Sequence, residues 1–328
     1  MKCTNRKIMV FVLCMLLTAG GSTGCGSLPY DMPYQADYDV SSFNVVSREE
    51  KRTAAPFASG LCVAARDVVS DEGPDMAQVE AAGLFGLENR EVLYAKNIHE
   101  RLHPASLTKV MTALVALENG QLNQTLTASD AVNITESGAV LCGLKSGDTM
   151  TLDQALRILL VYSANDVAML IAENIGGSVE RFVEMMNEKA HALGATNTSF
   201  RNPHGLTDSE HYTTAYDLYL IFNAAVKYDT FNEIIHMSDY QTAFYDRDGK
   251  EKAFDKQNSN QFLRGEYQAP TNVTVIGGKT GTTSAAGNCL ILLTRDENSS
   301  LYISVILRAE GPDVVYGRMV DLLDEIHK

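Results

Sequence analysis

The chain of 328 residues contains no tryptophan. It therefore lacks the largest aromatic side chain with which proteins stack on sugars or on nucleic-acid bases. Basic side chains are also scarce. Lys2, Arg6 and Lys7 are the only charged residues among the first 24, and the rest of the chain carries 24 basic and 41 acidic side chains, a net charge of −17. Because nucleic-acid binding requires a basic face for the phosphates, we expect no nucleic acid as a partner.

Cysteine is the next scarce residue with consequences. After two cysteines near the N-terminus and Cys25, only Cys62, Cys142 and Cys289 remain. Their spacing matches neither a metal site nor a disulfide framework. Cys62 and Cys289 lie in apolar runs, and we predict that they are small buried hydrophobic residues. The sequence thus predicts neither a metal nor a cofactor.

The N-terminus has the pattern of an export signal. A positive start precedes the apolar residues 8–17, a stretch too short to span a membrane as a mature helix. Ser22-Thr23-Gly24-Cys25 resembles a bacterial lipoprotein cleavage box, although leucine is usual where Ser22 stands. We expect a signal peptide over 1–24 and a lipid on Cys25 that anchors the protein to the outer face of the bacterial cytoplasmic membrane. Secretion after simple cleavage nearby stays the alternative.

Periodicity divides the remaining chain into a tether over 25–57 and one domain over 58–328. We predict a strand over Leu61–Ala65 and a hairpin over residues 81–94 that turns at 88–90. Residues 104–227 are predicted to be largely helical, with stops at Gly176-Gly177 and Gly194. A second hairpin is predicted over 288–294 and 301–307. A closing helix over 313–327 would bury Val314, Val320, Leu323 and Ile326.

Strands first, helices in the middle and strands last define the fold class. We predict an α+β fold in which an antiparallel sheet is formed from both ends of the chain and a helical lobe is inserted between them. No internal repeat or low-complexity segment interrupts this order.

Three short motifs carry the functional signal: Ser106-Leu107-Thr108-Lys109, Ser163-Ala164-Asn165 and Lys279-Thr280-Gly281. Each alone arises by chance, so their value lies in their order and placement. The first opens a predicted helix that ends at Asn119-Gly120. The second lies where one predicted helix gives way to another, and the third lies in a β-rich run.

These residues suit a serine nucleophile that is activated by lysine. A serine hydroxyl needs a base within hydrogen-bond reach, and Ser106 and Lys109 share one face of a helix. Lysine acts as a base only when it is partly neutral, and burial and a nearby cation both lower its pKa. We nominate Lys279 as that cation. Near a helix N-terminus, Ser106 would also have backbone N–H groups aimed at the reacting carbonyl.

A Ser-His-Asp triad is the alternative serine chemistry. No Gly-x-Ser-x-Gly sequence surrounds Ser106. We predict a structural role for His204 and a surface position for His99 and His103. No histidine is therefore assigned a catalytic role.

With Ala164 in place of aspartate, the three motifs are the pattern of penicillin-binding proteins and class A β-lactamases. From about residue 58 onward the chain resembles the low-molecular-weight penicillin-binding proteins, the serine-type D-Ala-D-Ala carboxypeptidases. The resemblance extends to residues 104–113, 202–206, 211–217 and 277–287. It implies a β-lactamase/DD-peptidase-like fold, and it implies stem peptides of peptidoglycan as substrates and β-lactams as covalent inhibitors.

The resemblance also implies roles for the motif residues. Ser106 would be the nucleophile, and Lys109 the base in both acylation and deacylation. Ser163 and Asn165 would pass on the proton and orient the substrate amide. The substrate carboxylate would bind at Lys279, Thr280, Gly281 and Thr282, and the N–H groups of Ser106 and Thr282 would form the oxyanion hole.

Three other functions stay open at this point. An endopeptidase that cleaves D-alanyl cross-links would use the same acyl-enzyme. A class A β-lactamase deacylates with a dedicated glutamate, for which Glu173 and Glu180 have no convincing context. An inactive module that only binds peptidoglycan has no physical need for both motif lysines.

Overall fold

The computed structural model describes residues 58–70 and 72–327. The predicted signal peptide, the predicted tether and Cys25 lie outside the described residues. In the described part of the chain, no helix is long and apolar enough to cross a membrane.

A five-stranded antiparallel sheet forms the centre of the domain, in the order β2-β1-β9-β8-β7. Two strands come from the beginning of the domain and three from its end: β1 (Val79–Gly86), β2 (Glu91–Lys96), β7 (Thr274–Thr283), β8 (Gly287–Arg295) and β9 (Leu301–Ala309). The α+β fold and both predicted hairpins are therefore confirmed.

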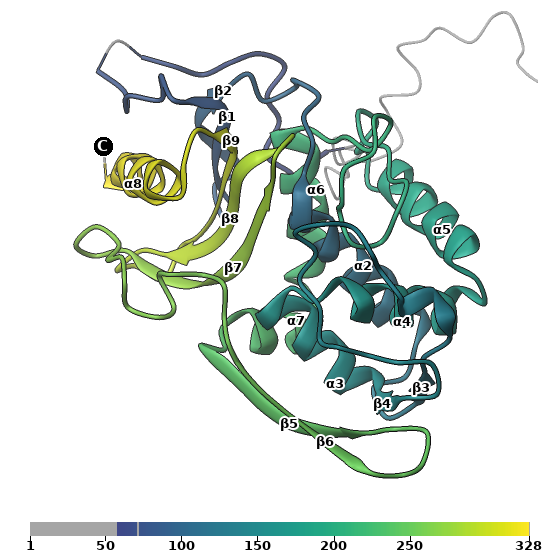
Figure 1. The fold of residues 1–328 in the computed structure, drawn as a ribbon. Coiled ribbons are helices and arrows are strands. Elements are labelled where there is room, and N and C mark those ends of the chain that lie inside the picture. The colour runs from purple at the N-terminus through teal and green to yellow at the C-terminus, as the bar shows by residue number, and fades with distance from the viewer. Residues whose placement is uncertain (1–57, 71, 328) are drawn as a thin grey trace, which may run out of the picture. The chain divides into compact units, whose positions relative to one another are not determined.

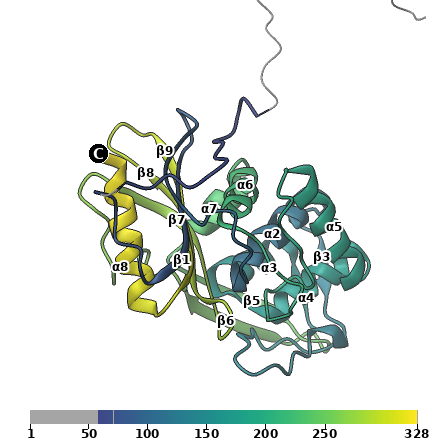
Figure 2. The same cartoon turned by 90° about the horizontal axis from the view of Figure 1, so that it is seen from above.

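The two faces of this sheet pack against different partners (Figures 1 and 2). On one face, α8 (Pro312–Leu323) covers Leu290, Leu292 and Ile306. On the other face, Ile291, Leu293 and Val305 pack against the helical lobe. Because side chains alternate along a strand, β8 supplies both cores with successive residues.

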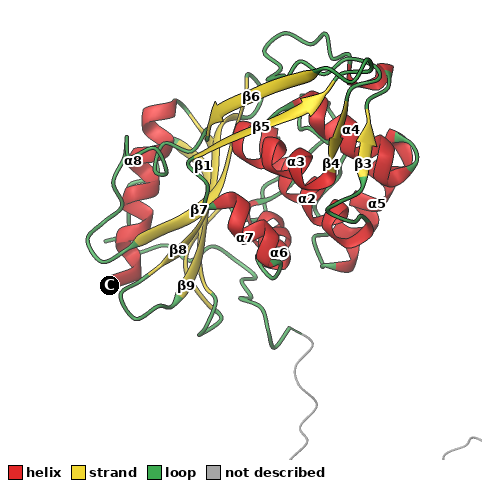
Figure 3. Cartoon of the chain, turned by 90° about the horizontal axis from the view of Figure 1, so that it is seen from below, coloured by secondary structure: helices red, strands yellow, loops and turns green. Residues whose placement is uncertain are grey.

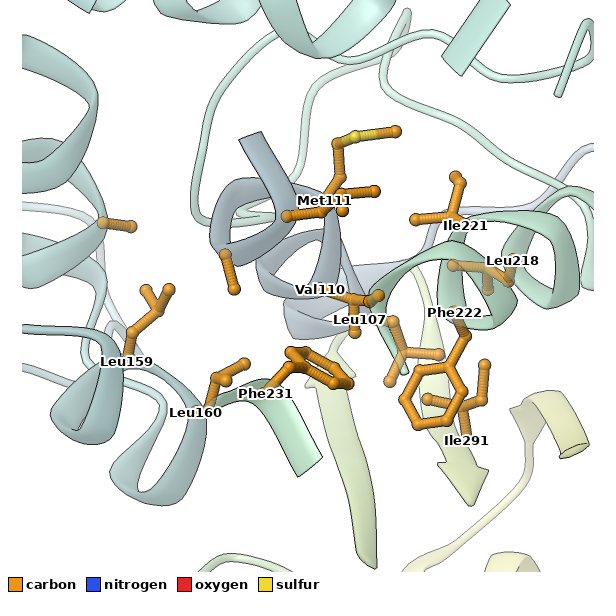
Figure 4. Packing of buried hydrophobic residues seen from close by; sticks show 14 of the residues in the cluster. Leu107, Val110, Met111, Leu159, Leu160, Leu218, Ile221, Phe222, Phe231 and Ile291 are labelled. Atoms are coloured by element: carbon orange, nitrogen blue, oxygen red, sulfur yellow. The ribbon is translucent and has the colours of Figure 1, made fainter. Parts of the chain in front are cut away.

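The helical lobe is arranged around α2 (Thr108–Asn119), in which every residue from Thr108 to Ala116 is buried. Figure 4 shows Leu107, Val110 and Met111 among side chains from the other helices and from β8. The surrounding helices are α3 (Leu152–Arg157), α4 (Asn165–Gly176), α5 (Val179–Ala192), α6 (Ala215–Ala225) and α7 (Asp229–Ile235). Gly177 and Gly194 adopt left-handed φ of 77° and 83° after α4 and α5, which confirms the predicted stops.

A second sheet, in the order β3-β4-β5-β6, was not predicted (Figure 3). Its strands are β3 (Thr125–Thr127), β4 (Thr149–Thr151), β5 (Asp239–Tyr245) and β6 (Glu251–Gln257). The first two have only three residues each, and β6 is mostly charged and exposed. Neither pattern gives the apolar alternation that identifies a strand from sequence.

Two predicted elements need correction. Residues Leu61–Ala65 form no strand, because the N–H of Cys62 donates to the hydroxyl of Tyr219 (2.8 Å) instead of to a neighbouring strand. The isolated bridge in this region joins Val68 to Ala95.

The closing helix exists, but it ends at Leu323 and continues as a 3-10 turn over Asp324–His327. Its buried residues include Val315, Met319, Leu322 and Leu323, whereas Val314, Val320 and Ile326 are only partly buried. The predicted burial of Leu323 is therefore confirmed, and the predicted full burial of Val314, Val320 and Ile326 was wrong. Cys62 and Cys289 are buried free thiols, as predicted.

Candidate active site

Ser106 lies in a 3-10 turn, Ala105–Leu107, that leads directly into α2. Ala105 has a φ of 48°, a conformation that costs a non-glycine residue free energy and is concentrated at functional sites. Gly281 of β7 packs against this turn, and a Cβ there would lie 2.9 Å from the backbone nitrogen of Ser106. The glycine of the third motif therefore lets β7 approach the serine closely.

Lys109 is fully buried, and its Nζ has three partners. It lies 2.9 Å from Oγ of Ser106, 2.6 Å from Oδ1 of Asn165 and 2.7 Å from the carbonyl oxygen of His204. The amide and carbonyl oxygens can only accept hydrogen bonds, whereas the serine hydroxyl can also donate one. A neutral amine has two hydrogens and one lone pair, so this environment directs its lone pair toward Ser106.

The electrostatic surroundings favour that neutral form. Burial lowers the pKa of Lys109 well below its ordinary value, and the nearby charge of Lys279 lowers it further, while Asp166 opposes the shift. Lys279 is itself buried, and burial lowers its pKa to about 7. Its Nζ donates to Oγ of Ser163 (2.9 Å) and to the carbonyl of Thr280 (3.0 Å). Lys279 is thus the neighbouring group whose positive charge lowers the pKa of Lys109.

The second motif lies in an irregular passage between two helices, as predicted. After α3 the chain makes a π-turn over Ile158–Tyr162, and Ser163 then adopts a left-handed φ of 71°. Irregular turns and strained residues of this kind often occur at functional sites. Asn165 begins α4 and faces Lys109. Its Nδ2 has no hydrogen-bond partner among the described residues and is free to donate to a substrate carbonyl.

Asp166 was not singled out from the sequence. It is buried at the start of α4 and accepts the N–H groups of Cys142 (2.9 Å), Gly143 (2.8 Å) and Leu144 (3.0 Å). The preceding Asn165 N–H donates to the carbonyl of Val140 (2.8 Å). Asp166 thus holds the 140–144 loop beside the second motif. An acidic residue in the first turn of a helix was the available signal, but this position usually indicates only a helix cap.

The third motif lies on β7, the edge strand of the five-stranded sheet. Thr280 is half-buried and Thr282 is exposed, while the Thr282 hydroxyl donates to Oδ1 of Asn288 (3.2 Å). The structure therefore brings Ser106, Lys109, Ser163, Asn165 and Lys279 together, with Thr280, Gly281 and Thr282 alongside them.

Arg308 is a second residue that sequence reasoning missed. It stands near the end of β9 with a φ of 53°, and its guanidinium has no hydrogen-bond or ion-pair partner in the part of the chain that the structure describes. It lines a cavity of about 300 Å³ with His103, which precedes the Ser106 turn, and Ala285, which follows β7. An unpaired guanidinium there is suited to bind an anion. No motif marks it, because its strain and its cavity exist only in the fold.

The histidines have structural contacts. His204 is buried, its Nδ1 accepts from the N–H of Leu206 (3.1 Å), and burial and Lys109 lower its pKa to about 3. His211 contacts Oγ1 of Thr108 (2.8 Å), and burial lowers its pKa to about 4. His99 is exposed as predicted, but His103 is partly buried and bonds to the His211 carbonyl (2.8 Å).

Two other kinds of catalytic group have no place beside the motif residues. Glu173 accepts from Ser129 (2.6 Å), and neither Glu173 nor Glu180 contacts the motif residues. Among the described residues, no cluster of His, Cys, Asp or Glu could hold a metal ion.

Comparisons with known proteins agree on one family. The D-alanyl-D-alanine carboxypeptidase family Peptidase S11 matches residues 70–311. The D-alanyl-D-alanine carboxypeptidase DacF of Bacillus subtilis is 35% identical over 254 residues, which cover 75% of this chain and 61% of the relative. DacB2 of Mycobacterium tuberculosis, also a D-alanyl-D-alanine carboxypeptidase, is 33% identical over 73% of this chain and 78% of the relative. This chain spans about three-fifths of the length of several such relatives.

Solved structures show the same likeness. The Streptomyces K15 DD-transpeptidase matches with a TM-score of 0.71 and 25% identity over 78% of this chain and 98% of that one. A D-alanyl-D-alanine carboxypeptidase from M. tuberculosis H37Rv matches with a TM-score of 0.67 and 29% identity over 80% and 94% of the two chains. The predicted β-lactamase/DD-peptidase-like fold is therefore confirmed.

Proposed function

This chain belongs to the Peptidase S11 family of D-alanyl-D-alanine carboxypeptidases, and we propose that it removes the terminal D-alanine from peptidoglycan stem peptides through an acyl-enzyme on Ser106. One observation carries the proposal. The Nζ of a buried lysine lies 2.9 Å from the serine hydroxyl, and its two other partners only accept hydrogen bonds. This arrangement is suited to a lysine that acts as a base.

Acylation follows from these contacts. Neutral Lys109 takes the hydroxyl hydrogen of Ser106, and Oγ attacks the carbonyl carbon of the penultimate D-alanine. The oxyanion that forms is stabilised by the N–H groups of Ser106 and Thr282. Asn165 donates its free Nδ2 to the carbonyl oxygen of the substrate residue that precedes the penultimate D-alanine. The serine ester forms as the amide bond to the last D-alanine breaks.

The leaving amine must receive a proton as that bond breaks. The Ser163 hydroxyl accepts from Lys279, so its own hydrogen is free to donate to the amine. Protonated Lys109 then returns a proton to Ser163. The terminal carboxylate of the substrate binds on β7 at the charge of Lys279 and the hydroxyls of Thr280 and Thr282. The Thr282 hydroxyl donates to Oδ1 of Asn288 in the structure and turns from it to donate to the carboxylate.

Deacylation reverses the first step with water in place of the peptide. Lys109, again neutral, deprotonates the water that attacks the Ser106 ester, and Ser106 recovers its hydrogen. No glutamate contacts the motif residues in the described part of the chain, so we expect the ester formed by a penicillin to hydrolyse slowly. β-Lactams are accordingly covalent inhibitors in this proposal, rather than substrates turned over by a β-lactamase.

The direct test uses a monomeric muropeptide that ends in D-Ala-D-Ala, the purified full-length chain and its Ser106→Ala variant. Mass spectrometry should show loss of one alanine with the wild type only. No loss from the monomer together with cleavage of D-alanyl cross-linked dimers would replace the carboxypeptidase with an endopeptidase. No reaction with either compound would favour a module that only binds peptidoglycan.

We also propose an arrangement at the membrane. In this proposal residues 1–24 are an export signal, a lipid on Cys25 anchors the protein to the outer face of the bacterial cytoplasmic membrane, and 25–57 tether the catalytic domain 58–328. The lipoprotein-like sequence before Cys25 supports it. Radiolabelled palmitate should enter the wild type and not the Cys25→Ala variant. Unlabelled mature protein in the culture medium would contradict the anchor and indicate secretion.

A further inference from the structure

The connection between β6 and β7 contributes a residue to the wall of the active site. In this connection, Oγ of Ser259 lies 2.6 Å from Oγ1 of Thr280 in the third motif. The backbone N–H of Ser259 donates to the carbonyl of Val161 (3.2 Å), two residues before Ser163. Ser259 therefore contacts both the strand that carries the Lys-Thr-Gly motif and the turn that presents the second motif.

The segment around Ser259 is fixed by buried polar contacts. The neighbouring residues Asn258 and Asn260 are almost fully buried. The Asn258 side chain donates to the carbonyl of Met237 (2.8 Å) and accepts from the N–H of Asn260 (2.8 Å). The Asn260 side chain accepts from the N–H of Phe262 (3.1 Å). A hydroxyl on such a segment has a defined position, as a supporting residue of a binding site requires.

The direction of the bond between the two hydroxyls decides what Thr280 offers a ligand. Each hydroxyl has one hydrogen, and neither side chain has another hydrogen-bond partner among the described residues. When Thr280 donates to Ser259, Thr280 has only lone pairs left, and these repel a carboxylate. When Ser259 donates to Thr280, the Thr280 hydrogen is free, and its bond to a carboxylate is strengthened by the bond that Thr280 accepts.

We propose that Ser259 is a positioning residue, which donates to Thr280 and so fixes the Thr280 hydroxyl as a donor to the terminal carboxylate of the substrate. This inference rests on the proposed function, because it assumes a ligand carboxylate at Thr280. In this proposal the three motifs are not sufficient for selectivity toward a free C-terminal carboxylate, because that selectivity also depends on Ser259, which lies outside them.

Two thioesters with the same N-acyl-D-alanyl group provide the test. One carries a thioglycolate leaving group with a free carboxylate, and the other carries its methyl ester. We expect Ser259→Ala in the full-length chain to lower kcat/KM for the carboxylate compound about tenfold, mainly by raising KM. This is the size of effect expected when one hydrogen bond to a charged group is lost. The methyl ester should react within about twofold of the wild-type rate, because it presents no carboxylate to Thr280.

Three further variants separate positioning from structural support. Ser259→Thr keeps the hydroxyl and should restore the carboxylate preference. In a Thr280→Val background, Ser259→Ala should have no further effect, since its partner is gone. Ser300→Ala is the control. Ser300 lies on the distant β8–β9 turn, where its hydroxyl donates to Glu88 of the β1–β2 turn (3.1 Å), so the variant should leave both rates unchanged.

The outcomes are distinct. Equal loss on both thioesters, or no loss on either, would contradict the inference while the wild-type reaction still supported the proposed function. If the wild type hydrolyses neither thioester and is not acylated by a penicillin, the proposed function fails and this inference fails with it.

Discussion

The two faces of the five-stranded sheet differ in what they bury. Under α8 the core consists mainly of apolar and tyrosine side chains, such as Leu290, Met319 and Leu322. The buried Thr294 and Ser304, which strand alternation places on the same face, are polar but uncharged. On the opposite side, the helical lobe buries the side chains of Lys109, Lys279 and Asp166 in full or nearly so. Burial of charge costs free energy unless partners compensate for it. One face of the sheet therefore stabilises the fold, whereas the other face carries ionisable side chains whose burial lowers stability and is suited to catalysis.

Backbone strain follows this division only in part. Of the seven non-glycine residues with positive φ in the described part of the chain, Ala105 and Ser163 lie at the motifs and Arg308 lies at the cavity beside them. The other four lie in turns and connections elsewhere: Arg90, Asn97, Asn272 and Ser299. Because strain persists only where surrounding packing enforces it, Ala105 and Ser163 depend on the packing of the helical lobe. The predictions that follow test this division, from the largest effect to the smallest.

Lys109→Met should have the largest effect. The thioether has no basic nitrogen, so acylation by a penicillin at neutral pH should slow by roughly 10²–10⁴-fold. The thermal midpoint should fall only slightly, because an apolar chain of similar length fills the space but leaves the side-chain oxygen of Asn165 and the carbonyl oxygen of His204 without their donor. Stopped-flow acylation and thermal denaturation check the two parts. A variant that keeps most of its acylation rate would remove Lys109 from the mechanism.

Leu322→Ala should produce the opposite result. The side chain is fully buried under the sheet, so the free energy of unfolding should fall by about 2–5 kcal/mol. Because α8 carries no motif residue, kcat/KM on a D-Ala-D-Ala peptide should change less than twofold below the melting temperature. Val320→Ala, at a partly buried position on the same helix, is the matched control and should cost less. A large loss of activity in a folded Leu322 variant would show that the two faces are coupled.

Stability should depend on pH through the helical lobe. The folded pKa values of His204 and His211, about 3 and about 4, lie below the ordinary value of 6.5. The unfolded chain therefore binds more protons than the folded one between these limits, and stability falls as pH is lowered from about 6.5 toward 4. Denaturant titrations at pH 7, 6 and 5 should show the fall in the wild type. The free energy of unfolding lost in Leu322→Ala should be the same at each pH. A loss that changes with pH would contradict the assignment of the pH dependence to His204 and His211.

Arg308→Gln should have the smallest effect. If the unpaired guanidinium binds the substrate carboxylate, the variant should raise KM for a D-Ala-D-Ala peptide by roughly tenfold with little change in stability. Arg295→Gln is the control, since Arg295 lines a separate cavity near the β8–β9 turn. An unchanged KM in the Arg308 variant would limit carboxylate binding to β7.

Features that depend on local spacing could be predicted from the sequence. The Ser106–Lys109 pair, the end of α2 at Asn119 and the sheet built from both chain ends follow from periodicity and motif order. Asp166, Arg308 and Ser259 could not be found in this way. Each acquires its significance from contacts with segments distant in the sequence. The strand predicted over Leu61–Ala65 was wrong for a related reason. Burial alternates along this segment as in a strand, but no neighbouring strand pairs with it.

The central claim is that Ser106 is the lysine-activated nucleophile. The most direct measurement incubates the full-length chain with a penicillin at neutral pH and locates the adduct by peptide mapping and mass spectrometry. We predict a single adduct on Ser106 that persists for minutes, that is absent from Ser106→Ala and that forms far more slowly in Lys109→Met. An adduct on another residue, or equal labelling of Lys109→Met and the wild type, would contradict the account.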